Sequence, residues 1–226
     1  LAGIVLLPFV GMLLGLLLGG RWLYRVALGT MPLGLLLAIA IAQRWFDAAA
    51  PLVYVLGNWT PPLGIALRAD GAAVAMLVAV AGVVGAIGLF ARADFALKAG
   101  ASETRDSFAY WLLLLAIWGA LNLVFVSGDL FTLYVALELL TFAGVPLVCL
   151  AGTGETLRAA LRYMLFALFG SVLYLLGAVL LYGGYGTLDI PLLASTVRPD
   201  AIARIALALM TAGLLAKTAL FPLHLW

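Results

Sequence analysis

The chain has 226 residues, of which 66% are hydrophobic and only 10% are charged, and its formal net charge is +2. This composition excludes an ordinary water-soluble globular domain, in which about a quarter of the residues are charged. The basic residues are scattered along the chain, so they form no stripe of the kind that binds a nucleic-acid backbone. We therefore expect lipid to surround most of the chain and expect no nucleic-acid partner.

The residue counts also limit the chemistry that the chain can perform. It contains one cysteine, Cys149, and one histidine, His224. These two residues cannot form a disulfide framework, a zinc site or an iron-sulfur cluster. The chain has no glycine-rich dinucleotide fingerprint either. We expect no cofactor and no metal, and we assign any redox chemistry to partner subunits.

Seven long apolar runs follow one another along the chain. A helix needs about 20 predominantly apolar residues to cross about 30 Å of hydrocarbon. The seven runs cover residues 2–19, 26–42, 71–91, 108–126, 130–151, 157–183 and 203–221. They lack the polar and apolar alternation of a barrel strand, so each run predicts a helix. The predicted fold is an all-α membrane protein, a bundle of about seven transmembrane helices of which the last is broken.

The charges between the runs predict an orientation in the membrane. With the N-terminus outside, seven arginines and lysines lie inside and four lie outside, which agrees with the positive-inside rule. We expect a multi-pass protein of the cell membrane, in particular the bacterial inner membrane. The chain begins in an apolar segment at Leu1 and stops at Trp226 directly after another one. We therefore expect a fragment of a longer protein.

Glu138 and Lys217 are charged residues deep inside apolar runs. A charge near the bilayer centre costs at least about 2.5 kcal/mol, so such residues are usually paired and functional. Burial favours the neutral forms of a carboxyl and an amino group, whereas mutual pairing favours their charged forms. We predict that the two side chains form a pair. Two interpretations stay open: a relay for protons or ions, and a static salt bridge that holds two helices together.

The residues around the pair extend the prediction. Pro222 interrupts the last apolar run, and His224 follows the interruption directly. Proline breaks a helix, and histidine titrates near physiological pH. His224 is therefore predicted to be a third member of the relay.

Other polar residues on the Glu138 helix receive separate interpretations. Asp129 lies at the start of the run, where a carboxylate accepts hydrogen bonds from the first amides, so it is predicted to be a helix cap. Tyr134 and Thr141 lie on the same helical face as Glu138. Tyr134 is the better candidate for a hydrogen bond near Glu138.

Three short stretches carry a resemblance to a known family. They are VSGDLF at residues 126–131, which precedes Glu138 on the same run, AK at 216–217, and FPLHLW at 221–226. In this order they resemble the antiporter-like membrane subunits shared by Mrp-type cation/proton antiporters, respiratory complex I and the membrane-bound hydrogenases. The resemblance is strongest over residues 108–226. The stretch GGYGTL at 183–188 favours the Mrp D-type subunit or its hydrogenase relatives over the complex I subunits.

The resemblance implies an organisation and a role for the named residues. Family members contain two inverted five-helix repeats, each of which forms a half-channel. By this resemblance, residues 1–226 form one membrane domain, with a three-helix segment at 1–105 and most of the first repeat at 106–226. It also implies that Glu138 and Lys217 are the charge pair that opens and closes during proton transfer, and that His224 lies on the proton path.

The expected function is that of a proton-translocating subunit of a multisubunit cation/proton (Na+/H+) antiporter or a related respiratory complex. The expected partners are other membrane subunits, protons, Na+ and the lipid bilayer. One alternative is an antiporter-like subunit of NADH-quinone oxidoreductase (complex I) or of a hydrogenase. Alternatives from other classes are a structural membrane subunit, in which the Glu138–Lys217 pair only assists assembly, and a carrier for an organic solute.

Overall fold

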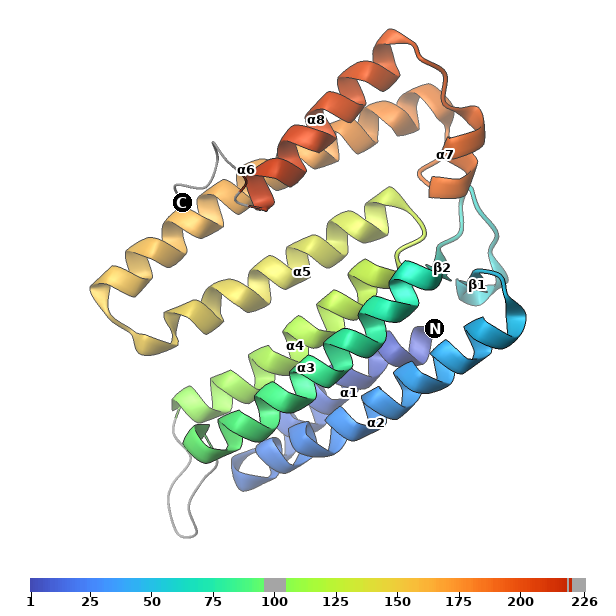
Figure 1. Cartoon of the computed structure of the whole chain (residues 1–226). Coiled ribbons are helices and arrows are strands. Elements are labelled where there is room, and N and C mark those ends of the chain that lie inside the picture. The colour runs from blue at the N-terminus through green and yellow to red at the C-terminus, as the bar shows by residue number, and fades with distance from the viewer. Residues whose placement is uncertain (96–104, 219, 221–226) are drawn as a thin grey trace. The chain divides into compact units, whose positions relative to one another are not determined.

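The computed structural model describes residues 1–95, 105–218 and 220, and helices make up most of them (Figure 1). The longer helices are α1 (Ala2–Leu18), α2 (Gly20–Ala48), α3 (Gly71–Phe95), α4 (Arg105–Val126), α5 (Leu130–Val148), α6 (Gly154–Tyr185) and α8 (Ala201–Lys217). The shorter elements are α7 (Ile190–Thr196), the 3-10 turns η1 (Leu56–Asn58) and η2 (Cys149–Ala151), and the paired strands β1 (Leu52–Val55) and β2 (Ala66–Ala69).

Each predicted apolar run overlaps a helix, and the predicted all-α membrane fold is confirmed. Five helices in the described part of the chain, α2 to α6, are long and apolar enough to cross a membrane. Helices α1 and α8 have 17 residues each, so a count of seven spanning helices is not confirmed. Large apolar side chains such as Phe90 and Phe142, 78% and 65% exposed, lie on the surface, as expected for helices that face lipid.

Helix α8 ends earlier than its apolar run predicts. Its last residue is Lys217, whereas the run extends to residue 221. The Thr218 amide donates a hydrogen bond to the Leu214 carbonyl, and its hydroxyl donates to the Leu215 carbonyl at 3.2 Å. Such local side-chain bonds compete with helix continuation. Pro222, where the sequence predicts the break, lies outside the described residues.

The chain forms two compact units. The first comprises Leu1–Tyr54 and Arg68–Val126, with helices α1 to α4, and the second comprises Val55–Leu67 and Ser127–Trp226, with α5 to α8. The predicted division after residue 105 concerns repeats rather than packing, so it stays a prediction.

The first unit has an apolar core in which large rings meet small residues. The Trp118 ring lies against Gly34 of α2, where there is no room for a side chain. A polar contact crosses this core: the Asn122 amide of α4 donates to the Ile4 carbonyl of α1 at 2.8 Å. Asn122 is completely buried. Its hydrogen bond satisfies a carbonyl that lipid could not satisfy.

In the second unit, α6 packs along α8. Tyr174 of α6 and Met210 of α8 belong to one buried cluster, against which Leu130 and Tyr134 of α5 also pack. The Tyr174 hydroxyl donates to the Leu130 carbonyl at 3.2 Å. Helix α6 therefore holds both α5 and α8, and the predicted site residues Glu138 and Lys217 lie on the two helices that it holds.

Candidate functional site

The start of helix α5 is fixed by the Ser127-Gly128-Asp129 segment. The Asp129 carboxylate accepts hydrogen bonds from the amides of Phe131 (3.0 Å) and Thr132 (2.7 Å), which confirms the predicted helix cap. A side chain at position 128 would collide with the Ala66 carbonyl, so this backbone approach requires glycine.

Backbone hydrogen bonds tie the same segment to the first residue of α7 and to the residues just before it. The Gly128 carbonyl accepts from the Ile190 amide, and the Leu130 amide donates to the Leu188 carbonyl, both at 3.0 Å. These bonds flank an antiparallel bridge between Asp129 and Asp189. The N-terminal end of α5 is therefore anchored, and Glu138 follows about two and a half turns later.

Glu138 and Lys217 form an ion pair in the interior of the second unit. The Lys217 Nζ lies 3.0 Å from the Glu138 Oε1, and the lysine and glutamate side chains are 9% and 14% exposed. Lys217 is the last residue of α8, where the carbonyl end of the helix favours a cation. The sequence-predicted pair is thus brought together across two helices.

Three acceptors of α5 surround the Lys217 ammonium. Besides Glu138, its Nζ donates to the Thr141 hydroxyl at 3.3 Å and reaches the Leu137 carbonyl at 3.5 Å. An ammonium group has three donors and no acceptor. The arrangement therefore matches the charged form of the lysine, with one α5 acceptor for each N–H.

Helix α6 adds a hydroxyl group to this site. Ser171, which is 1% exposed, donates a hydrogen bond to the Glu138 Oε1, and its hydroxyl also lies 2.9 Å from the Ala167 carbonyl. The carboxylate therefore contacts a hydroxyl of α6, and the ammonium contacts the Thr141 hydroxyl of α5.

A close approach of α6 and α8 positions Lys217. A Cβ atom at Gly170 would lie 2.7 Å from the Gly213 carbonyl and 3.4 Å from the Lys217 Cγ. No side chain fits at that separation, and glycines at such positions let helix backbones approach closely. The stem of Lys217 therefore passes directly over the α6 backbone on its way to Glu138.

The sequence predictions for the site residues meet different outcomes. Thr141 accepts a hydrogen bond from Lys217, whereas the Tyr134 ring, the better candidate from the sequence, packs beside Phe131. His224 lies outside the described residues, so its role stays a prediction. Ser171 was not predicted, because a single serine in an apolar run gives no sign of which helix it faces.

Among the residues that the structure describes, the site shows no means of holding a metal. No group of three or more histidine, cysteine, aspartate or glutamate side chains comes together there. Carboxylate, ammonium and hydroxyl groups in hydrogen-bond contact can pass a proton between them. The charged pair and its hydroxyls form one connected network.

Known proteins are similar to this chain in sequence and in fold. Residues 127–226 match the family model described as NADH:quinone oxidoreductase/Mrp antiporter, TM. The chain is 33% identical to the D-type subunit of the Na(+)/H(+) antiporter of Alkalihalophilus pseudofirmus, over 98% of this chain and 45% of that protein. It is 36% identical to the N-type subunit of the NADH-quinone oxidoreductase of Desulforudis audaxviator, over 84% of this chain and 37% of that protein.

A solved structure extends the likeness to the fold. A chain of an archaeal membrane-bound sulfane sulfur reductase superposes with a TM-score of 0.89 at 26% identity, covering 100% of this chain and 46% of that one. The present chain thus spans less than half the length of these relatives. It is a multi-pass membrane protein, and it belongs to the family of antiporter-like membrane subunits found in Mrp antiporters and NADH-quinone oxidoreductases.

Proposed function

We propose that the chain is part of a proton-translocating subunit of a multisubunit Na+/H+ antiporter or a related respiratory complex. Glu138 and Lys217 are then the pair that changes its protonation and separation during transport. The observation that carries the proposal is the buried ion pair, with 3.0 Å between Nζ and Oε1, among helices that can cross a membrane. Ionisable residues at such depth mark ion and proton pathways.

In this proposal the pair alternates between the charged form, which the observed hydrogen bonds fit, and a neutral form. Transfer of one proton from the Lys217 ammonium to the Glu138 carboxylate neutralises both groups and removes their attraction. In the structure three α5 acceptors surround the Lys217 Nζ, and a neutral amine has only two N–H donors for them. The lysine is then free to separate from α5, which couples its protonation to its position.

Ser171 acts on Glu138 as a positioning residue in this scheme. Its hydroxyl has one hydrogen and two acceptors in reach, the Glu138 Oε1 and the Ala167 carbonyl. A charged carboxylate is the stronger acceptor, because charge-assisted hydrogen bonds are about twice as strong as neutral ones. Protonation of Glu138 lets the hydroxyl turn to Ala167, so Ser171 follows the charge of Glu138.

The remaining parts of the function rest on the relatives. The names of the relatives describe subunits of antiporters and of NADH-quinone oxidoreductases. We infer that this chain assembles with other membrane subunits in a bacterial cell membrane, and that Na+ is the exchanged cation. We also infer that His224 continues the proton path beyond Lys217.

Proton flux measured with the full-length subunit in its assembled complex tests the proposal. In proteoliposomes carrying a pH-sensitive dye, Lys217→Ala and Glu138→Gln should each lower flux at least about tenfold. Asp129→Asn is the matched control, because asparagine also caps helices and the change removes no charge from the membrane interior. Wild-type flux in an assembled Lys217→Ala complex contradicts the proposal.

The structural alternative predicts a different pattern. If the ion pair only holds α5 against α8, assembly should fall in each single variant while flux per assembled complex stays constant. Amounts of assembled complex are therefore measured beside flux. An organic-solute carrier predicts solute-dependent uptake, whereas the proposal predicts flux that depends on H+ and Na+ alone.

For Ser171 the informative comparison is between two substitutions. Ser171→Ala removes the hydroxyl with almost no change in volume, and Ser171→Thr keeps it. We expect the alanine variant to shift the pH profile of flux and the threonine variant to restore it. An unchanged profile in a folded Ser171→Ala protein argues against the positioning role.

A further inference from the structure

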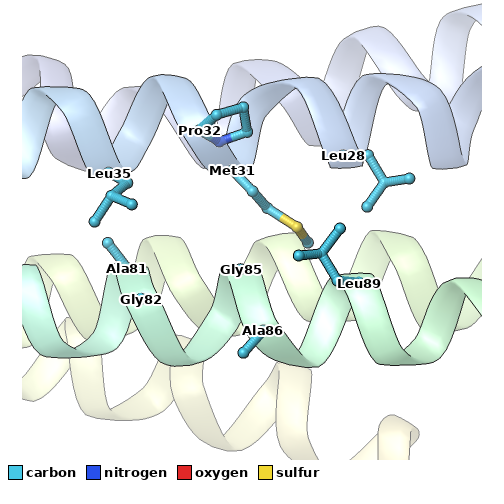
Figure 2. A pocket seen from close by; sticks show the side chains of 9 residues that line it. All are labelled: Leu28, Met31, Pro32, Leu35, Ala81, Gly82, Gly85, Ala86 and Leu89. Atoms are coloured by element: carbon cyan, nitrogen blue, oxygen red, sulfur yellow. The ribbon is translucent and has the colours of Figure 1, made fainter.

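An apolar groove lies between helices α2 and α3 of the first unit (Figure 2). Its volume is about 420 Å³, which is within the usual range of ligand sites. Leu28 and Leu35 mark its two ends on α2, and Leu89 and Ala81 mark the corresponding ends on α3. Its lining offers almost no polar surface, so a polar small molecule is a poor occupant.

The groove exists because glycines on α3 have no side chains and a proline on α2 has a compact one. On α3, Cβ atoms at Gly82 and Gly85 would meet nothing within 4 Å. On α2, the compact ring of Pro32 faces the same space. A hollow of this kind in a membrane-facing surface is filled by lipid or by another protein, because water is absent at that depth.

Arg25 extends the α2 wall of the groove. It precedes Leu28 by three residues, and Leu28, Pro32 and Leu35 follow it at helical spacings of three, four and three residues. Residues at these spacings share one face of a helix. Arg25 therefore lies on the groove face of α2, about one turn beyond the Leu28 end.

Arg92 extends the α3 wall in the same way. It follows Leu89 by three residues, and Gly82, Gly85 and Leu89 repeat the spacing of three and four. Helix α3 runs antiparallel to α2, because Gly88 near the end of α3 lies against Met31, whereas Gly71 at its beginning lies against Trp45 near the end of α2. Arg92 consequently lies at the same end of the groove as Arg25.

The two arginines are available for an anion. Both are exposed, and within the described part of the chain neither forms an ion pair. The Arg25 guanidinium lies 5.0 Å from the Trp22 ring centre and 5.9 Å from that of Tyr24. Tryptophan, tyrosine and arginine at the end of an apolar span are typical of the headgroup level of a membrane.

We propose that this groove binds an anionic phospholipid. One acyl chain lies along Pro32, Gly82 and Gly85, and the phosphate group lies between Arg25 and Arg92. An apolar groove with a basic end fits this ligand because each part of the lipid meets a surface of matching chemistry. A partner helix would fill the apolar part but gives no reason for arginines at one end of both walls.

Lipid retention by the purified full-length complex tests the site. The complex is exchanged into vesicles of equal parts phosphatidylglycerol and phosphatidylethanolamine, extracted again, and its bound lipid is measured by mass spectrometry. We expect phosphatidylglycerol enrichment in the wild type. Arg25→Gln and Arg92→Gln should each lower the enrichment by about fivefold, and both together should lower it roughly multiplicatively.

Matched variants separate the groove from the rest of the surface. Gly85→Leu fills the groove and should remove the bound lipid, whereas Gly29→Leu adds the same side chain to an open position of α2 outside the lining and should leave the lipid bound. Arg44→Gln removes an exposed arginine from the other end of α2 and should leave enrichment unchanged.

Three results would overturn the proposal. The first is equal retention of the two lipids by the wild type. The second is undiminished phosphatidylglycerol enrichment in the folded Arg25→Gln/Arg92→Gln double variant. The third is crosslinking to another subunit, and not to lipid, by a photoreactive residue placed at Leu35. That outcome would identify the groove as a subunit interface.

Discussion

The two compact units bury polarity in different forms. The interior of the first is crossed by a neutral hydrogen bond, from the Asn122 amide to the Ile4 carbonyl. The interior of the second holds a carboxylate, an ammonium and two hydroxyls in one network around Glu138 and Lys217. A neutral bond has one protonation state and therefore serves packing, whereas the charged network has at least two states that differ in energy.

The two units also differ at a close contact between helices, in the kind of atom that a glycine meets. At Gly88 of the first unit the neighbouring atoms belong to the flexible end of Met31. At Gly170 of the second unit the nearest atom is the backbone carbonyl of Gly213. The contact at Gly88 can therefore adapt to small changes, while the contact at Gly170 holds Lys217 in a rigid setting.

The largest expected effect concerns the ion pair. Lys217→Met leaves the Glu138 carboxylate buried without its partner, which should cost about 3–5 kcal/mol of unfolding free energy. Adding Glu138→Gln removes the unpaired charge and should recover most of the stability without recovering proton flux. Unfolding in mixed micelles and flux in proteoliposomes are the two measurements. Recovery of flux in the double variant would show that the pair only serves stability.

Replacing a glycine in each unit should give the next largest effect. Gly170→Ala forces α6 and α8 apart and should cost about 1–3 kcal/mol, as overpacking does. It should also lower flux, because Lys217 moves away from α5. Gly88→Ala is the matched control and should cost less, since the Met31 side chain can move. Thermal unfolding of both variants decides the point, and equal losses would contradict the difference in rigidity.

A smaller effect is expected from the neutral hydrogen bond of the first unit. Asn122→Ala leaves the Ile4 carbonyl buried without a donor and should cost about 1–2 kcal/mol. Flux per folded complex should stay at the wild-type level, because no charge is lost. A loss of flux that exceeds the loss of folded complex would mean that this contact also takes part in transport.

The smallest effect is expected at an exposed carboxylate of the second unit. Hydrogen bonds from the Ala203 amide and from the Tyr185 hydroxyl hold the pKa of Asp200 below its usual value. A lowered folded-state pKa stabilises the protein above the unfolded-state pKa, about 3.9, and this stability is lost as the pH falls through the folded-state value. Asp200→Asn should therefore weaken the dependence of the melting temperature on pH below about pH 4. An unchanged pH profile would contradict this assignment.

The sequence alone predicts the features that depend on local pattern. Runs of apolar residues locate the helices, and Asp129 before such a run identifies the cap of α5. The pairing of Glu138 with Lys217 was also expected, because a charge in lipid needs a partner. The family resemblance, strongest after residue 108, agrees with the match over residues 127–226.

Features that depend on which helices are neighbours were not predictable. The contact of Ser171 with Glu138 needs α6 to face α5, and nothing in an apolar run fixes that direction. Thr141 and Tyr134 share a helical face, so only the position of α8 decides which of them meets Lys217. The short helix α7 was missed because seven residues carry too little periodicity.

The anchored start of α5 limits how much a rotation of this helix displaces Glu138. Asp129 and its backbone bridges hold this end, and at 1.5 Å per residue Glu138 lies about 14 Å and Val148 about 28 Å along the helix from it. A rotation of α5 about its anchored end displaces Glu138 by about half as much as Val148. The anchor is thus a pivot, and a movement of the far end of α5 is reduced by about half at the contact between Glu138 and Lys217.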